Sequence, residues 1–237
     1  MRKFNRKNDQ SRKVKIEPNF CKSADGSCII SYGMTKVICT ATLDDDLPRW
    51  LKEKKTGWIT AEYGMLPGST NTRNKRESRI GRQSGRTIEI QRLIGRSLRS
   101  VVELEKLNGF QVILDCDVIQ ADGGTRTASI SGSFVALNLA LKKFIKKNFI
   151  KSNPVKDYVA AISCGIVNGK VLVDLDYDED SSADVDANFI MTKKSGFSEI
   201  QISGENSTFS YQSVSQMVDK TKKIVNQIFD IQKNAIK

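Results

Sequence analysis

A short run of glycine, threonine and arginine stands where a predicted strand gives way to a predicted helix. It reads Gly123-Gly124-Thr125-Arg126-Thr127. Two adjacent glycines let the backbone turn sharply, and a helix N-terminus presents unpaired N–H groups with about half a positive charge. A threonine hydroxyl and a planar guanidinium add donors that suit phosphate oxygens. The glycine spacing is neither that of a P-loop nor that of a dinucleotide fingerprint. The run therefore predicts a phosphate site of another kind, with an ordinary turn as the alternative.

Two further features can complete such a site. Arg86 follows Gly85 just before a predicted helix and can reach an anion, although a solvated loop arginine is the alternative. Like charges that crowd together raise carboxyl pKa values and favour a hard divalent cation such as Mg²⁺, and a carboxyl with a raised pKa can protonate a leaving oxygen. Part of this acidic cluster must be ordinary solvated charge. The cluster consists of Asp174, Asp176, Asp178, Glu179, Asp180, Asp184 and Asp186.

Composition narrows the chemistry. The chain of 237 residues contains no histidine, which excludes Ser-His-Asp and Cys-His catalysis and histidine-ligated metals. The net charge of +11, from 38 basic and 27 acidic residues, favours a polyanionic partner, most commonly nucleic acid. The five cysteines are scattered and are expected to be reduced, buried, small apolar residues. Together these features indicate phosphoryl chemistry on a polyanion and leave hydrolysis, phosphorolysis and polymerisation open.

The basic residues are concentrated in one part of the chain. They are Arg73, Lys75, Arg76, Arg79, Arg82, Arg86, Arg92, Arg96 and Arg99. Residues 68–86 are turn-rich and too polar to bury, so they predict a surface loop or a partner-facing segment. The tip of the segment 1–15 is expected to be partly mobile. No apolar run reaches the roughly 20 residues of a membrane helix, and no apolar segment follows the basic start, so the cytoplasm is the expected location.

The strands and helices that position these residues can be predicted from sequence patterns. A hairpin is predicted over 27–43, with its turn near Gly33-Met34, and Asn168-Gly169 predicts a second hairpin turn. A helix over 87–107 is predicted to start at an N-cap Thr87 and to bury Ile90, Ile94, Leu98 and Val101. Further strands are predicted at 57–67, 110–120, 158–167, 170–177, 188–193 and 199–203. Further helices are predicted at 127–147 and, near the C-terminus, over the apolar positions from Val214 to Ile228. The pattern gives ββ-then-α units twice over, an α+β fold of mixed sheets covered by helices in a single domain, residues 1–237.

Several long blocks resemble bacterial ribonuclease PH in order and without large gaps, from about residue 2 to 235. They are GWITAEYGMLPGSTNTRNKRE, GRQSGRTIEIQRLIGRSLRSVV, DCDVIQADGGTRTASISG and SCGIVNGKVLVDLDYDEDSSADVD. The resemblance implies the fold of that family and a phosphorolytic 3′-to-5′ exoribonuclease, a nucleotidyltransferase that trims tRNA precursors and other RNA 3′ ends with inorganic phosphate and releases nucleoside diphosphates.

The resemblance also implies roles for individual residues. Phosphate would be bound by Arg86, Thr125 and Arg126 with the Gly124 backbone, the positions already proposed from their chemistry. Asp180 and Asp186 match a pair that holds a divalent metal, Mg²⁺ or Mn²⁺, and Asp186 is also a candidate acid for the leaving 3′ oxygen.

The family further implies a homohexamer, a trimer of dimers, in which the loop 68–79 supports the ring and guides tRNA. Gly68 departs from the family, which usually has an arginine there, and this bears on ring stability or substrate binding. The arginines expected to bind RNA are Arg73, Arg76, Arg79, Arg92, Arg96 and Arg99. A catalytically inactive RNA-binding ring subunit is the main alternative function. It would be expected to lack one of the phosphate or metal residues, and all of them are present.

Overall fold

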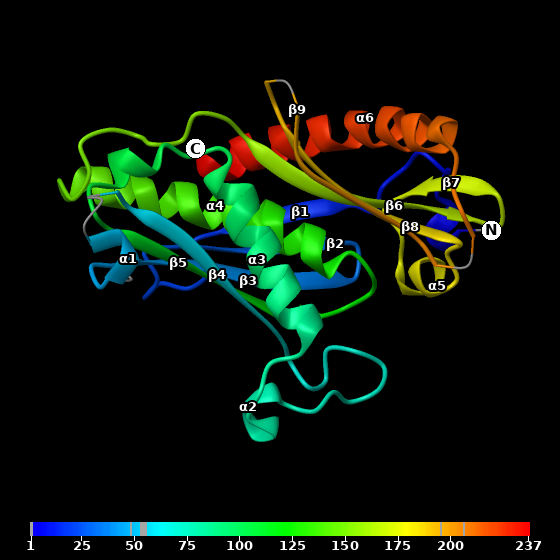
Figure 1. The fold of residues 1–237 in the computed structure, drawn as a ribbon, viewed down its shortest axis with the longest axis horizontal. Helices are drawn as coiled ribbons and strands as arrows, with labels where there is room; N and C mark the ends of the chain where they lie inside the picture. The colour runs from blue at the N-terminus through cyan, green and yellow to red at the C-terminus, as the bar shows by residue number, and fades with distance from the viewer. Residues whose placement is uncertain (1, 48, 53–55, 195, 206) are drawn as a thin grey trace.

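The computed structural model of the chain describes residues 2–47, 49–52, 56–194, 196–205 and 207–237. Two β-sheets are joined by helices that pack on and between them (Figure 1). The five-stranded sheet contains β1 (Val14–Pro18), β2 (Gly26–Tyr32), β3 (Thr35–Asp44), β4 (Trp58–Met65) and β5 (Gln111–Gln120). The four-stranded sheet contains β6 (Val159–Val167), β7 (Lys170–Val173), β8 (Val185–Thr192) and β9 (Gly196–Gly204). The helices are α1 (Arg49–Lys52), α2 (Glu77–Ile80), α3 (Gly85–Arg99), α4 (Thr125–Lys146), α5 (Tyr177–Ser181) and α6 (Tyr211–Ile236), with single 3₁₀ turns at Lys3–Asn5 and Leu104–Leu107.

The five-stranded sheet has the order β1-β2-β3-β5-β4, and only the β4–β5 pair is parallel. The predicted hairpin is confirmed: β2 and β3 pair antiparallel around Gly33, whose φ of 57° suits a residue without a side chain. In β5 the predicted alternation is also confirmed. Val112, Leu114, Cys116 and Val118 are buried, and the intervening aspartates lie on the other face. This strand runs directly into the Gly123-Gly124 turn.

The four-stranded sheet, in the order β7-β6-β8-β9, is antiparallel throughout. Asn168 and Gly169 form the predicted turn between β6 and β7, and both have positive φ, 49° and 69°. Such a pair matches the right-handed twist of the strands that it connects. The short β7 leads straight into the acidic segment and α5, which places that segment at one end of the sheet.

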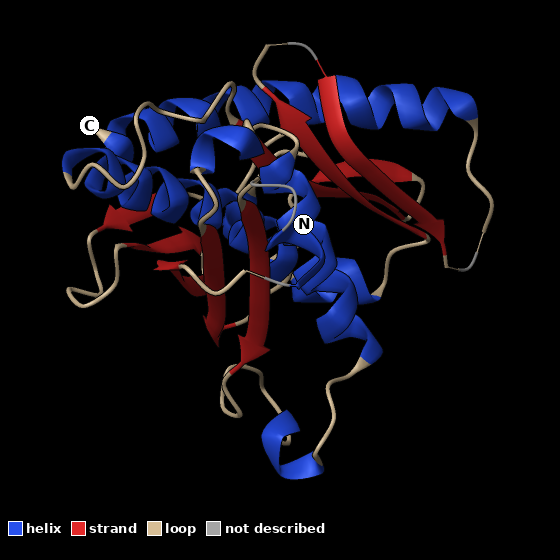
Figure 2. Ribbon diagram, turned by 60° about the vertical axis from the view of Figure 1, so that its left-hand side comes forward, coloured by secondary structure: helices blue, strands red, loops and turns tan. Residues whose placement is uncertain are grey.

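Helix α4 lies at the centre of the molecule and contacts strands of both sheets (Figure 2). Most of its side chains are buried, so its apolar surface is not confined to one face. One continuous hydrophobic core extends from the five-stranded sheet through α4 to the four-stranded sheet and α6. The predicted α+β class is confirmed. Four of the five cysteines are buried and all five are free thiols. No helix within the described ranges combines the length and apolar character that a membrane crossing needs.

The predicted helix 87–107 has different ends in the structure. Ser84, rather than Thr87, is the N-cap, because its side chain accepts a hydrogen bond from the Thr87 N–H. The helix ends at Arg99, since Val102 forms an isolated β-bridge with Val155 beyond it. Its apolar stripe is buried as predicted. The surface segment before it, 68–84, projects away from the body and includes the short α2 (Figure 1).

Candidate active site

The Gly123-Gly124 turn closes β5 and begins α4. The φ angles of the two residues are +75° and +68°, a region that other residues rarely enter. A Cβ on Gly123 would lie 2.5 Å from the Leu175 carbonyl oxygen, so the turn packs directly against the backbone of the acidic segment. Gly124 is the N-cap of α4 and offers no side-chain cap. The Gly124 N–H donates to no other residue of the described ranges, which leaves it available to an anion.

Thr125 is held in place by Tyr63, a residue that is not among the predicted site residues. Its hydroxyl lies 2.9 Å from the Tyr63 hydroxyl, and both side chains are buried. Burial raises the pKa of Tyr63, so this phenol stays protonated at neutral pH and keeps its O–H donor. Tyr63 is carried by β4, which pairs with β5. The parallel pairing of these strands thus places the phenol beside the start of α4.

Arg126 projects from the first turn of α4 toward α3 and β9. Its guanidinium donates to the Gln201 side-chain oxygen at 3.0 Å and forms a longer ion pair with Glu89, 3.5 Å. The Gln201 amide donates in turn to Glu89 at 2.9 Å. The Glu89 side chain is 39% exposed, so Arg126 is oriented by a neutral amide and a partly solvated carboxylate rather than by a buried carboxylate.

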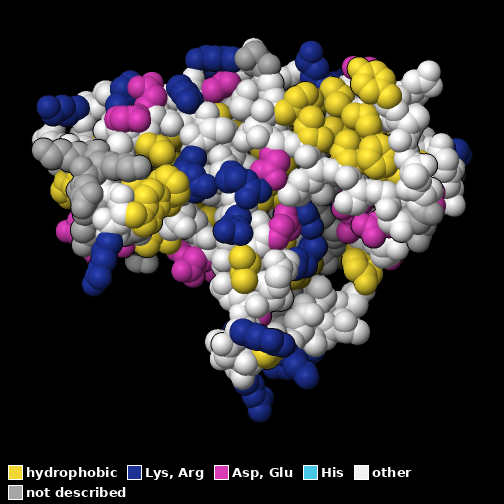
Figure 3. Space-filling model, viewed as in Figure 1, with side chains coloured by type: hydrophobic (Ala, Val, Ile, Leu, Met, Phe, Trp, Pro, Cys, Tyr) yellow, Lys and Arg dark blue, Asp and Glu magenta, His cyan; other side chains and the backbone are white. Residues whose placement is uncertain are grey.

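Arg86 lies in the first turn of α3 rather than just before the helix, because the helix starts three residues earlier than predicted. It is exposed and forms no hydrogen bond or ion pair with another described residue. It lines a groove of about 790 Å³ between the end of β4 and the projecting segment, together with Tyr63, Arg76 and Asp117. Figure 3 shows the lysine and arginine side chains that gather on this projecting segment and on the surface beside α3. The groove is therefore open, basic and continuous with the turn before α3.

Asp180 and Asp186 are close enough to Arg86 and Arg126 for their charges to interact. Burial raises the pKa of Asp186 to about 6, and the charge of Asp180 adds to the shift while Arg126 and Arg86 oppose it. Burial also raises the pKa of Asp180, against the attraction of Arg86 and Arg126. The Asp186 Oδ1 atom is buried without a hydrogen-bond partner among the described residues. A buried oxygen that lacks a hydrogen-bond partner and interacts with the charge of a second carboxyl is suited to a cation or a proton.

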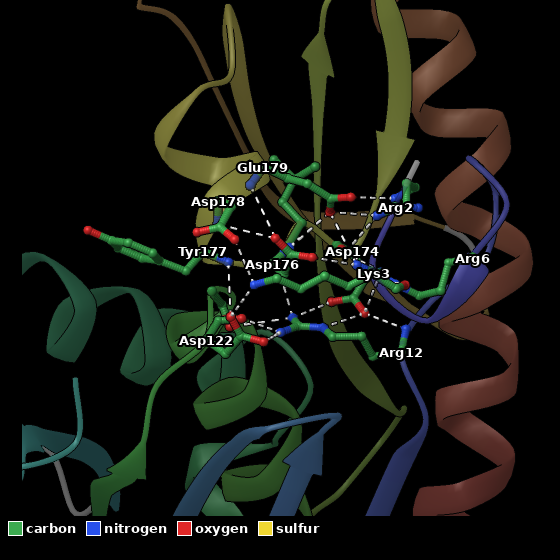
Figure 4. A network of polar contacts seen from close by, with 12 residues as sticks. Arg2, Lys3, Arg6, Arg12, Asp122, Asp174, Asp176, Tyr177, Asp178 and Glu179 are labelled. Carbon is green, nitrogen blue, oxygen red and sulfur yellow. Dashed lines mark hydrogen bonds and ion pairs between the residues drawn. The ribbon is translucent and has the colours of Figure 1, made fainter. Parts of the chain in front are cut away.

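Three other carboxylates of the segment, those of Asp174, Asp176 and Glu179, form ion pairs with arginines of the N-terminal segment. Arg2 contacts Glu179 at 2.6 Å, Arg6 contacts Asp176 at 3.1 Å, and Arg12 contacts Asp174 at 2.6 Å (Figure 4). These three carboxylates are neither solvated charge nor free to bind a metal, because buried arginines already neutralise them. The same arginines attach the segment 1–15, whose tip is predicted to be partly mobile, to the acidic segment from residue 2 onward.

No group of three or more His, Cys, Asp or Glu side chains within the described ranges has an arrangement that holds a metal ion. A cation at this site would thus take two protein carboxylates at most, Asp180 and Asp186. Mg²⁺ suits such a site, because it usually keeps several waters and binds one or two carboxylates together with substrate phosphates. The orphaned Asp186 oxygen fits that role.

The arginines predicted to bind RNA lie in three settings. Arg73, Arg76 and Arg79 are exposed on the projecting segment, and Arg92 is exposed on α3. Arg96 is also exposed but pairs with Glu199 at 2.8 Å. Arg99 is half-buried: it donates to the Ile59 carbonyl at 2.7 Å and stacks over Trp58. Gly68 has no atom within 4 Å of where a Cβ would be, so a larger side chain would fit there.

Comparisons with known proteins identify the family of the chain. The models of the 3′ exoribonuclease family match residues 10–143 as its domain 1 and residues 157–224 as its domain 2. A protein of Neisseria meningitidis serogroup C named ribonuclease PH is 51% identical over 234 residues, which cover 99% of this chain and 97% of that protein. Its namesake from Neisseria gonorrhoeae is 52% identical over 96% of this chain and 94% of its own length.

Solved structures show the same fold at lower identity. The Archaeoglobus fulgidus exosome with RNA bound to the active site contains a chain that superimposes with a TM-score of 0.80 at 23% identity, covering 97% of this chain and 91% of the other. Because this match covers nearly the whole chain, it supports the α+β architecture at full length.

Proposed function

The chain belongs to the 3′ exoribonuclease family of ribonuclease PH proteins, and we propose that the site described above binds the phosphate and the RNA 3′ end for that family's reaction. The chain is a phosphorolytic 3′ exoribonuclease. An oxygen of inorganic phosphate attacks the last phosphorus of the RNA, the bond from that phosphorus to the preceding 3′ oxygen breaks, and a nucleoside diphosphate leaves. The freed 3′ oxygen takes a proton. The substrate we propose is the 3′ end of tRNA precursors.

The observation that best supports this assignment is that the charges of Arg86 and Arg126 act on Asp180 and Asp186, with Arg126 in the first turn of α4. Phosphate attack brings two anions together, so the site must first offset their repulsion. Arg86 and Arg126 supply guanidiniums from two different helices, and the N–H of Gly124 and the hydroxyl of Thr125 supply neutral donors. Fixed donors and charges of this kind stabilise a transition state because they need no reorganisation as charge develops.

The carboxyl pair would serve the leaving oxygen. Asp180 and Asp186 would hold Mg²⁺, or Mn²⁺, and when bound the cation supplies positive charge that offsets the charge growing on the bridging oxygen. Asp186 has its pKa raised to about 6 and is thus suited to hold a proton that the 3′ oxygen can take. The orphaned Oδ1 atom of Asp186 is the feature of this chain that calls for either partner.

Substitution of Asp186 by asparagine tests these roles. The Asp186→Asn variant should bind RNA as tightly as the unaltered chain but release nucleoside diphosphate at least about 100-fold more slowly. Asp178→Asn is the matched control: it lies on the same segment, its side chain is 69% exposed, and its turnover should be unchanged. RNA binding is followed by gel shift and turnover by diphosphate release. Unchanged turnover in Asp186→Asn would refute the assignment.

We also propose that the chain forms a homohexamer, a trimer of dimers, in the cytoplasm. Apolar side chains gather over the four-stranded sheet in Figure 3, and large exposed ones in this part of the chain include Phe197, Ile200 and Phe209. Exposed apolar patches of this kind commonly mark protein interfaces. Sedimentation at several concentrations measures the mass directly, and a stable monomer would contradict the ring.

A further inference from the structure

One buried arginine joins the phosphate turn to the acidic segment. Arg12 is 3% exposed, and its guanidinium binds both carboxylate oxygens of Asp174, at 2.6 and 3.0 Å. The same guanidinium donates to the Leu175 carbonyl at 3.2 Å, the Gly123 carbonyl at 3.4 Å and the Asp122 carbonyl. Figure 4 shows Arg12 between Asp122 on one side and Asp174 on the other. A planar fork with five donors can make this set of contacts at once, whereas a lysine cannot.

A second buried group holds the same turn from the opposite strand. The Thr35 hydroxyl donates to the Gly123 carbonyl at 2.7 Å and accepts from the Asp122 N–H at 2.9 Å. Thr35 begins β3 and is fully buried. Its single hydroxyl therefore satisfies the Asp122 N–H and the Gly123 carbonyl, which lie on either side of the Asp122–Gly123 peptide bond. Arg12 contacts the carbonyls of both Asp122 and Gly123, so the orientation of this peptide is fixed by two side chains.

The contacts of Arg6 provide an internal comparison. Arg6 is also buried, and it binds the Asp174 carbonyl at 2.8 Å, Asp176 at 3.1 Å and Glu179 at 3.2 Å. None of the described contacts of Arg6 reaches the Gly123-Gly124 turn. Arg6 and Arg12 therefore both neutralise the acidic segment, but only Arg12 links that segment to the start of α4.

We propose that Arg12 and Thr35 are positioning residues that hold the phosphate-binding turn in place relative to the segment carrying Asp180 and Asp186. This inference rests on the proposed function of that turn. The N–H of Gly124 and the side chains of Thr125 and Arg126 follow the clamped peptide directly, so a rotation of the peptide displaces all three. Displacements near 1 Å can cost roughly 100-fold in rate, and a displacement confined to the turn acts first on bound phosphate.

The matched pair Thr35→Val and Thr35→Ser tests this clamp. Valine keeps the shape of threonine without its hydroxyl, and serine keeps the hydroxyl. Initial rates of nucleoside diphosphate release are measured at varied phosphate with RNA saturating, and at varied RNA with phosphate saturating. Thr35→Val should raise the KM for phosphate roughly tenfold or more while the KM for RNA stays within about twofold, and Thr35→Ser should stay near the unaltered chain on both.

A second pair covers the case in which Thr35→Val does not fold. Arg12→Lys and Arg6→Lys both keep the positive charge in the same buried network. Arg12→Lys should raise the phosphate KM by roughly tenfold, and Arg6→Lys should leave it within about twofold. Melting temperatures identify any general loss of stability.

Equal phosphate KM values for the two lysine variants, or a phosphate KM for Thr35→Val within about twofold of the unaltered chain, would overturn the clamp. Proportional rises in both KM values would overturn it as well, because they would indicate a general structural defect. An unaltered chain that releases nucleotide without phosphate would refute the proposed function instead, so the two failures are distinguishable.

Discussion

Arginines and carboxylates meet in two adjoining regions of the molecule, with opposite degrees of pairing. In the buried network, Arg2, Arg6 and Arg12 contact carboxylates at 2.6 to 3.1 Å, and the side chains of these arginines are at most 7% exposed. At the candidate site, Arg86 has no partner among the described residues and the Asp186 Oδ1 atom has no hydrogen bond. Paired charges fix the fold, whereas charges left without partners retain their interaction energy for a ligand.

The largest expected effect is a loss of stability when a charge is removed from the buried network. Asp174→Asn keeps the size of the side chain and tolerates its φ of +57°, but it removes the charge that two buried arginines face. The free energy of unfolding in urea should fall by about 3 to 5 kcal/mol, because breaking a buried pair leaves an uncompensated charge. Asp178→Asn, on the exposed side of the same segment, should cost less than about 1 kcal/mol. Equal losses in the two variants would remove the distinction between the regions.

The next largest effect is expected on catalysis, when the unpaired Arg86 of the candidate site is removed. Arg86→Ala should lower kcat/KM for phosphate by about 100-fold, since it removes a charge-assisted donor from the anion site. Its melting temperature should be unchanged, because Arg86 is exposed and unpaired among the described residues. Kinetics at varied phosphate and a thermal melt of one preparation measure both quantities. A destabilised variant with normal kinetics would place Arg86 with the structural arginines.

Stability should also depend on pH through Asp186. Its pKa is raised from 3.8 to about 6, so the folded chain binds this proton more tightly than the unfolded chain does. Between these two pH values the folded state holds more protons, and its stability therefore falls as pH rises. Without divalent cations, the unaltered chain should lose about 1 to 2 kcal/mol relative to Asp186→Asn across pH 4 to 6, after allowance for solvent screening. Parallel stability curves would contradict a raised pKa.

The smallest effect is expected for Arg96, which is neither buried in the ion-pair network nor left without a partner. It is exposed and pairs with Glu199 at 2.8 Å on the surface of α3 and β9. Arg96→Ala should change the free energy of unfolding by less than about 1 kcal/mol, as surface pairs do. A weakened RNA complex in a gel shift with unchanged phosphate kinetics would place Arg96 on the RNA path, as its position on a basic helix face predicts.

The two regions also differ in how far sequence could predict them. Arg86, Gly124, Thr125 and Arg126 carry local signals, since turn glycines and a helix start define them, and the strand and hairpin patterns predict the elements that carry them. The pairing of Arg6 and Arg12 with Asp174 spans more than 160 residues and leaves no periodicity or motif. In the sequence, the segment 174–186 therefore looks like a single acidic loop. Only the structure separates the carboxylates that pair with arginines from Asp180 and Asp186.

The same limit applies to the groups that orient the site. Tyr63 lies beside Thr125 only because β4 pairs with β5 in parallel, and Gln201 reaches Arg126 only because β9 lies against α3. Nothing in the neighbourhood of either residue in the sequence indicates a partner. The α3 boundaries differ for a local reason, a serine cap three residues before Thr87, that the sequence contains but does not distinguish from other serines.

The most direct test is an incubation of the full chain with Mg²⁺ and a tRNA carrying extra 3′ nucleotides, with and without inorganic phosphate. Nucleoside diphosphates that form only when phosphate is present are the predicted result, since the arginines and the α4 N-terminus are proposed to bind phosphate as the attacking group. Nucleoside monophosphates that form without phosphate would mean that water is the attacking group and would contradict the central claim. RNA that binds but is never shortened would instead indicate an inactive ring subunit.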